Sequence, residues 1–299
     1  MSSVNSVPEH HGVEIGFDER VTSDQRPFVE RSIAALIEQR SERFTRQRSE
    51  NRKRAEVLRR IHAPLLRIVE QDPEASRALG ELRAETWSEN NDGYELAPKS
   101  ISTPSRPQSV ELRGFELIGL PYHYDWHWRD GDGPLGPHMT ADHTTGKATV
   151  DSKVVGSGTW TAGHAGIGVV LTTHDEVAAA ARSARKVHTW GAASSAPWGG
   201  SATSEGGTEM TVFEDSHLVA SGVEKRWRVR TSNGESRYDA PEGDVIADPI
   251  EVTWVMRPGS VYTLNVGAWT YCEYHDGIAH QSESISFVDM NVLFIGLDR

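Results

Sequence analysis

The sequence contains a single cysteine and no long hydrophobic run. One cysteine, Cys272, excludes an internal disulfide and every zinc or iron–sulfur site that needs several thiolates. Its context, YCEYHDG, predicts the end of a strand before an Asp-Gly turn, so we expect an inert, half-buried thiol. No window approaches the ~18 consecutive apolar residues that a membrane-spanning helix needs. The sequence therefore predicts a protein without a membrane span.

The N-terminal segment lacks the features of a secretory signal. Its first residues, MSSVNSVPEHHGVEIGFDER, include neither a basic segment nor an apolar one. The mean hydropathy of -0.51 and the hydrophobic content of 37% are typical of a soluble protein. We therefore expect a cytoplasmic location.

Sequence fingerprints of common catalytic sites are missing. DGDG at 130–133 begins like a calcium loop, but no glutamate follows at the EF-hand spacing. GSGTWTAGHAGIG at 156–168 is rich in glycine, but it lies between predicted strands and does not open a helix, which excludes a dinucleotide-binding turn. There is no G-x-S-x-G nucleophile elbow. We therefore assign no catalytic residue, and a binding or assembly protein is favoured over an enzyme.

Charge is unevenly distributed along the chain. The 31 Lys/Arg and 43 Asp/Glu residues give a net charge of -12. Residues 20–70 hold 13 Lys/Arg and 7 Asp/Glu, a net charge of +6, which leaves -18 for the remainder. Such an asymmetry indicates two modules with different partners.

Residues 26–90 are predicted to form an α-helical arm. Between 26 and 71 there is no glycine, and apolar residues recur at helical spacing. Pro64 predicts a kink or a break in this helix. Because 39–54 has only Phe44 as a large apolar residue, we expect this middle part not to be deeply buried.

Three further segments complete the N-terminal part. Residues 1–25 are polar and mixed, which predicts a tail that is disordered or docked. A second helix is predicted at 72–88, where Asp72 can cap the first turn and Pro73 takes the first helical position. Residues 91–107 are dense in Ser and Pro, which is typical of a linker, so the domain boundary is placed there.

After the linker, the hydrophobic period changes from 3.6 to 2, which predicts strands. They are expected at 108–119, 121–129, 148–156, 158–172, 208–214, 217–231, 250–257, 261–274 and 283–296. One helix is expected at 172–188, where a capping-box spacing precedes four alanines, and a long loop is expected at 191–207. Residues 108–299 are therefore predicted to form a mainly β domain, an antiparallel β-sandwich or jelly roll of about eight strands.

The stretch YHYDWHWRDGDG, from Tyr122 to Gly133, alternates aromatic and polar residues. In a strand, the aromatic side chains lie on one face and the His, Asp and Arg side chains on the other. A sandwich strand needs one apolar face, so the aromatic face is predicted to lie in the core. The alternative is an exposed row on which sugar rings stack. The candidate ligand-binding residues of such a carbohydrate site are Trp126, Trp198, Trp269 and Tyr271.

The polar face and the segment after it contain six candidate metal ligands, His123, Asp125, His127, His138, Asp142 and His143. Imidazole and carboxylate groups together suit zinc or another first-row divalent metal. His123 and His127 are about 13 Å apart along a strand, too far to share an ion. Asp125 and His127 can share one if 138–143 supplies a third ligand. A divalent metal is the one cofactor that the sequence suggests.

The arm is predicted to mediate association. Its arginines could contact the phosphates of a nucleic acid, but interleaved glutamates form i,i+4 pairs with them, so a nucleic-acid partner is not expected. Its sparse apolar face suits a partner helix or the acidic β domain of another copy, which predicts a homo-oligomer formed through residues 26–70. The sequence thus predicts a non-enzymatic binding or assembly protein whose sandwich recognises a ligand, with carbohydrate as the specific form. The alternative is a metal-dependent enzyme built on the cluster at 123–143.

Overall fold

The computed structural model describes residues 12–78, 115–132, 137–155, 160–196, 198–239, 245–277 and 282–298. Helix α1 (Arg26–Gln71) is followed by a helical turn at 73–78. The strands are β1 (Glu14–Phe17), β2 (Phe115–Ile118), β3 (Tyr124–Gly131), β4 (His138–Asp142), β5 (Lys147–Val155), β6 (Trp160–Leu171), β7 (Val177–Ser194), β8 (Ser201–Glu214), β9 (His217–Ser232), β10 (Ser236–Asp239), β11 (Val245–Met256), β12 (Tyr262–His275) and β13 (Glu283–Asp298).

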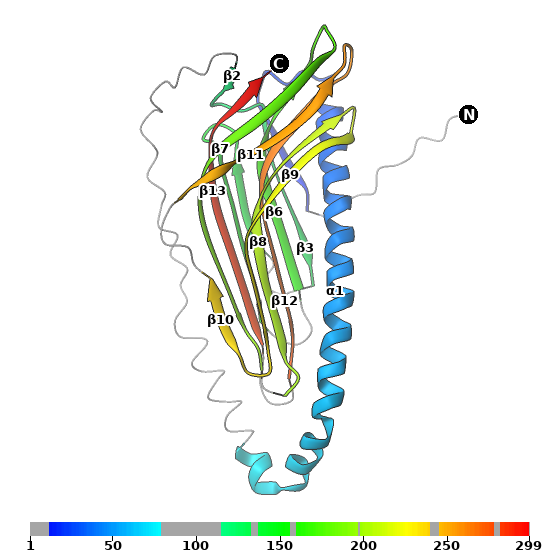
Figure 1. Ribbon diagram of the computed structural model, residues 1–299, viewed down its shortest axis with the longest axis vertical. Helices are drawn as coiled ribbons and strands as arrows, with labels where there is room; N and C mark the ends of the chain where they lie inside the picture. The colour runs from blue at the N-terminus through cyan, green and yellow to red at the C-terminus, as the bar shows by residue number, and fades with distance from the viewer. Residues whose placement is uncertain are drawn as a thin grey trace, which may run out of the picture.

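The strands form two antiparallel sheets that face each other as a β-sandwich (Figure 1). The first sheet has the order β1-β3-β6-β12-β8-β9, and the second has the order β10-β7-β13-β5-β4, with β11 beside β7 and β2 beside β13. Helix α1 runs along the outer face of the first sheet (Figure 1). The predicted fold class, a mainly β sandwich preceded by a helical arm, is therefore confirmed.

Alternation of apolar and polar residues located most strands correctly. The strands predicted at 261–274 and 283–296 are β12 and β13, each displaced by at most two residues. Of the strand predicted at 108–119, only β2 lies within the described residues. The linker predicted at 91–107 lies outside them, so the domain boundary stays a prediction.

The helix predicted at 172–188 is wrong, because Val177–Ser194 form strand β7. Its residues alternate between buried and more exposed positions, the period of a strand. β7 pairs with β13 on one side and with β11 on the other. The helix propensity of alanine exceeds that of ordinary residues by about 0.7 kcal/mol or less per residue, and this pairing overrides it.

The loop predicted at 191–207 is also wrong for most of its length, since β7 continues to Ser194 and β8 begins at Ser201. Two of its glycines make room for Trp227 of β9. A Cβ atom at Gly191 or Gly206 would overlap the indole ring. Trp227 also donates from Nε1 to the Oγ atom of Ser204 at 3.0 Å. These two glycines are therefore explained by packing around a buried tryptophan.

Helix α1 continues through Pro64 without a break and ends at Gln71. The second predicted helix is present at 73–78, and its remainder lies outside the described residues. The described part of the N-terminal tail is docked, because β1 pairs with β3. No helix in the described parts of the chain is both long and apolar enough to cross a membrane.

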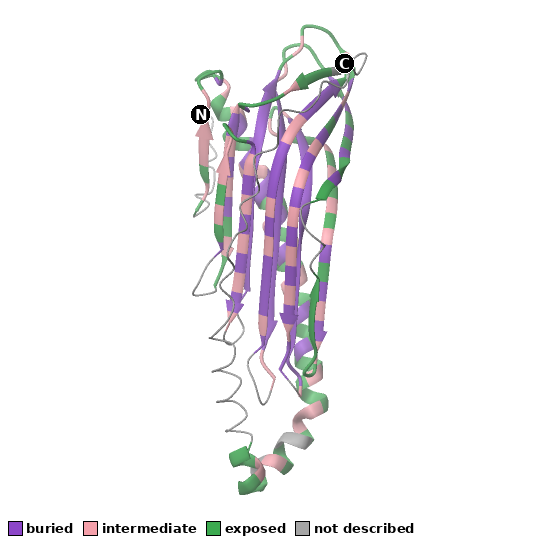
Figure 2. Ribbon diagram, turned by 90° about the vertical axis from the view of Figure 1, so that its left-hand side faces the viewer, coloured by how far each residue is buried: buried purple, intermediate pink, exposed green. Residues whose placement is uncertain are grey.

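The hydrophobic core has two parts. One fills the space between the sheets and includes Val150, Ile167, Leu264 and Met290. The other lies between α1 and the first sheet, where Val29, Ile33, Leu36, Ile37 and Phe44 pack on Tyr124, Trp126, Trp128, Trp269 and Tyr271. In Figure 2, buried residues follow the strands over most of their length, whereas the far end of α1 is exposed. The first half of α1 is thus part of the core.

The middle of α1 is more deeply buried than predicted. Arg40, Phe44 and Asn51 have exposed fractions of 7%, 1% and 7%. The prediction counted only large apolar residues. Here the polar residues are buried as well, because carboxylates on the first sheet meet them.

Candidate functional site

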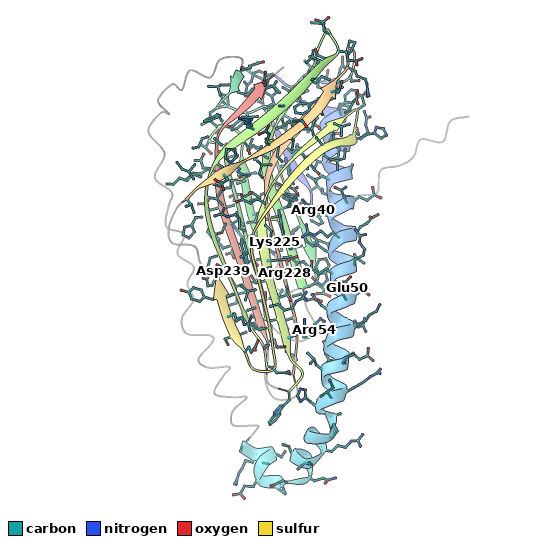
Figure 3. The ribbon with its side chains drawn as sticks, viewed as in Figure 1. Arg40, Glu50, Arg54, Lys225, Arg228 and Asp239 are labelled. Atoms are coloured by element: carbon teal, nitrogen blue, oxygen red, sulfur yellow. The ribbon has the colours of Figure 1, made fainter. Side chains whose placement is uncertain are left out.

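A set of buried charged groups lies between α1 and the first sheet, and the sequence analysis did not predict it. Glu205 and Glu209 on β8 and Glu273 on β12 have exposed fractions of 0%, 1% and 1%. Cations from α1 and β9 form ion pairs with Glu205 and Glu209. Figure 3 labels Arg40 and Arg54 on α1, opposite Lys225 and Arg228 on β9. We call this contact between α1 and strands β8, β9 and β12 the seam.

At one end of the seam, Glu209 lies between Arg40 and His164. Arg40 forms an ion pair with the Glu209 carboxylate, and the Nε2 atom of His164 lies 3.0 Å from Oε1 of Glu209. Burial, followed by the charge of Arg40, lowers the pKa of His164 well below 6.5. Glu209 alone would favour the imidazolium, but Arg40 already balances its charge. Burial lowers the pKa of Arg40 to about 10, so the guanidinium stays charged at neutral pH.

Further along the seam, Glu205 contacts three cations. Its carboxylate lies 3.2 Å from Nζ of Lys225, 3.4 Å from Nε of Arg228 and 4.0 Å from the guanidinium of Arg43. These partners come from β9 and α1, so Glu205 links the helix to β9, the edge strand of the first sheet.

The third carboxylate, Glu273, is held mainly by uncharged groups. It accepts hydrogen bonds from the Nδ2 atom of Asn51 and, at 2.7 Å, from the hydroxyl of Tyr271. The Nε2 atom of His275 lies 3.0 Å from its other oxygen. Burial and the nearby charge of Glu273 raise the pKa of Tyr271. The phenol is therefore a donor at neutral pH.

A signal for the seam is present in the sequence. Arg40 and Asn51 lie at helical spacing from Ile33, Ile37 and Phe44, so they share the face that is buried. Glu205 and Glu209 are four residues apart on one strand and therefore share a face. Neither set indicates a buried site by itself, because charged residues are mostly exposed.

The four candidate carbohydrate-binding residues do not form an exposed row. Trp126, Trp269 and Tyr271 are 0% exposed and lie beneath α1, so their rings cannot stack on a sugar at the surface. Trp198 is half-buried at a separate turn, with a φ angle of 55°. The prediction that the aromatic face of 122–128 lies in the core is confirmed.

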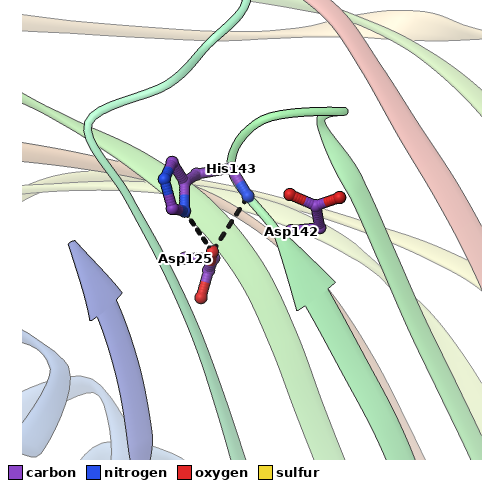
Figure 4. A group of neighbouring side chains, drawn as sticks. All are labelled: Asp125, Asp142 and His143. Carbon is purple, nitrogen blue, oxygen red and sulfur yellow. Dashed lines mark hydrogen bonds and ion pairs between the residues drawn. The ribbon is translucent and has the colours of Figure 1, made fainter. Parts of the chain in front are cut away.

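Three of the six candidate metal ligands lie together. Suitable ligand atoms of Asp125, Asp142 and His143 are all within 4.8 Å of one another (Figure 4). Asp125 accepts hydrogen bonds from the backbone N–H of His143 at 2.9 Å and from its ring Nδ1. Although partial burial alone would raise the pKa of Asp142, hydrogen bonds from Thr144 and Thr145 hold it below its usual value. Both carboxylates are thus held in place by hydrogen bonds.

The other three histidines make different contacts. The Nδ1 atom of His123 accepts a hydrogen bond from the backbone N–H of Val170 at 2.9 Å, and burial lowers the pKa of this imidazole. His127 lies 3.6 Å from Glu14 of β1. His138 pairs in register with Asp151 of β5. Among the candidate ligands, Asp125 thus lies near Asp142 and His143, whereas His127 lies near Glu14.

Cys272 is fully buried, not half-buried as predicted, because its side chain points between the sheets. Its Sγ atom lies 3.1 Å from Oγ of Ser286 and 3.3 Å from the carbonyl oxygen of Ser152. Burial raises the pKa of this thiol to about 12, which disfavours the thiolate.

The chain matches no protein-family model and no curated protein.

Proposed function

We propose that the protein is a non-enzymatic binding and assembly protein whose helix α1 joins copies of the chain into a homo-oligomer. The first half of α1 is covered by contact with the first sheet. Its C-terminal end extends past the ends of the strands (Figure 1). This projecting end of the helix is the surface that a second copy covers.

The observation that carries the proposal is an exposed apolar stripe that begins just after Arg54 and continues toward the projecting end of α1. Val57, Ile61 and Ile68 have exposed fractions of 56%, 62% and 64%. Their spacing of four and seven residues puts them on one helical face. Burying such a stripe against a partner is favourable, because it removes apolar surface from water.

Charge favours a second copy of this chain as the partner. Residues 20–70 carry +6 and the rest of the chain carries -18. The basic helix of one copy therefore attracts the acidic remainder of another. Because exposed charges are screened by salt, the association should weaken at high ionic strength.

The test is the mass of the full chain in solution, measured by light scattering after size exclusion. We expect a multiple of 33.0 kDa at low salt. The double substitution Ile61→Ser and Ile68→Ser should shift the mass to that of the monomer, and 1 M NaCl should weaken the complex. Deleting residues 1–70 is a poorer test, because it would uncover Trp126 and Trp269.

Val255→Ser is the matched control, since Val255 is an apolar residue of β11 that is 45% exposed. It should leave the mass unchanged. A wild-type chain that is monomeric at low salt, or a double variant with unchanged mass, rules out the projecting end as the interface.

A carbohydrate-binding form of this proposal has less support. It needs exposed aromatic rings, and three of its four candidate residues are buried beneath α1. We therefore do not include a sugar ligand in the function proposed.

The cluster of Asp125, Asp142 and His143 supports a second proposal, a divalent metal site that would serve a metal-dependent enzyme. Two carboxylates and one imidazole suit a first-row divalent ion such as Zn²⁺. The hydrogen bonds that orient Asp125 and Asp142 are of the kind that supports metal ligands.

Zn²⁺ titration of the purified chain, with elemental analysis, tests this second proposal. One ion per chain is expected, with affinity reduced at least about 10-fold by Asp125→Asn or His143→Gln. His138→Gln is the control, because His138 lies outside the cluster. The metal proposal fails if binding is not saturable or if the control variant loses as much affinity as the other two.

A further inference from the structure

A small pocket opens at the seam, where α1 passes over β8, β9 and β12. It is lined by Asn51 and Arg54 of α1, Ser201 and Thr203 of β8, Arg230 of β9, and Glu273 and His275 of β12. Two of these residues, Arg54 and Arg230, carry guanidinium groups, and they come from α1 and β9. Figure 3 shows Arg54 on the side of α1 that faces the strands.

The carboxylates near the pocket already have hydrogen-bond or ion-pair partners. Glu273 accepts hydrogen bonds from Asn51 and Tyr271 and lies beside His275. Glu205 is surrounded by Lys225, Arg228 and Arg43. Neither carboxylate forms an ion pair with Arg54 or Arg230 among the described residues.

Arg230 is therefore incompletely balanced. One of its terminal nitrogens donates to Oδ1 of Asn51 at 2.9 Å, whereas its Nε is buried and has no hydrogen-bond partner among the described residues. Burial, then the charges of Arg228 and Arg54, lower its pKa, and the carboxylates Glu205 and Glu273 offset this only in part. Two guanidinium groups of like charge thus line one pocket, in a chain whose net charge is -12.

We propose that this pocket binds a small tetrahedral oxyanion, a phosphate ion or the phosphate group of a ligand. Guanidinium groups match the oxygens of phosphate in charge and geometry. The hydroxyls of Ser201 and Thr203 add neutral donors. A bound anion would relieve the repulsion between the guanidinium groups of Arg230 and Arg54. Since these two residues come from β9 and α1, the anion also fastens the helix to the sheet.

Calorimetric titration of the full chain with inorganic phosphate tests the proposal, with chloride at matched ionic strength as the reference. Saturable binding of one phosphate per chain is expected, together with a higher melting temperature in phosphate than in chloride. Arg54→Gln should weaken binding about 10-fold, because one charge-assisted hydrogen bond is lost. Arg54 is exposed, so this variant should keep the fold.

Arg52→Gln is the matched control. Arg52 is also exposed, but it lies two residues earlier and therefore on the other side of α1. It should bind phosphate as the wild type does. If Arg54→Gln and Arg52→Gln lose the same phosphate affinity, the binding is only general attraction by a basic helix. If binding and melting temperature are the same in phosphate and chloride, the site is excluded.

A second titration distinguishes the two sources of the anion. Glycerol phosphate that binds more tightly than inorganic phosphate identifies the group of a larger ligand, and weaker binding identifies the free ion. Either result is independent of the mass in solution, so the phosphate site and the homo-oligomer succeed or fail separately.

Discussion

Replacing Trp126 with alanine is expected to lower the free energy of unfolding by about 3–5 kcal/mol. The indole is 0% exposed, lies between α1 and the first sheet, and packs edge-on against His164 with ring centres 4.6 Å apart. Alanine would leave a cavity between α1 and the sheet, and neither element can move far enough to fill it. Chemical denaturation followed by circular dichroism measures the change.

His127→Ala is the control for Trp126→Ala. His127 follows Trp126 on β3, and its side chain points to the other face of the sheet, where it is 22% exposed and lies 3.6 Å from Glu14. The cost should be about 0.5 kcal/mol or less, as for other surface substitutions. If both variants unfold at the wild-type denaturant concentration, the aromatic face of β3 does not support the core.

Alternation along β3 predicted which face is buried, but not what covers it. A strand in a sandwich has its apolar face against the opposite sheet, whereas Tyr124, Trp126 and Trp128 face α1. The reason is that the first sheet is covered on both faces, by the second sheet and by the helix. Strand β7 was missed for a related reason, because alanine favours a helix locally and only the pairing with β11 and β13 makes it a strand.

The sequence predicted which residue types form the candidate metal cluster, but not which of the six candidate ligands lie together. Asp125 and His127 point to the same face of β3, yet His143 comes from the turn after β4 and reaches only Asp125. That proximity depends on how β3 and β4, which belong to different sheets, lie beside each other. The seam was not predicted at all, since Arg40 and Glu209 are 169 positions apart in sequence and each resembles a solvated charge when it is considered alone.

Replacing Arg40 with methionine is expected to destabilise the fold by about 3–5 kcal/mol at pH 8. Methionine fills most of the space, but it leaves the Glu209 carboxylate buried without its cation, and that carboxylate is 2% exposed. The double variant Arg40→Met and Glu209→Met should recover most of this loss, because removing both partners leaves no buried charge. Arg60→Met is the control, since its ion pair with Glu56 is exposed, and should cost about 0.5 kcal/mol or less.

The cost of Arg40→Met should depend on pH through His164. In the native protein the pKa of His164 lies below its unfolded value of 6.5, so the unfolded chain binds an extra proton below that pH and stability is lost as pH falls. Without Arg40, the carboxylate 3.0 Å from His164 favours the imidazolium and raises its pKa, which adds stability at low pH that is lost as pH rises. As pH falls, the wild type thus loses stability while the variant gains it, and both changes reduce the difference in stability between them. The destabilisation measured by denaturation should therefore be smaller at pH 5.5 than at pH 8 by about 1 kcal/mol, since one proton contributes about 1.4 kcal/mol per pH unit. A cost that is constant with pH would show that His164 does not respond to Arg40.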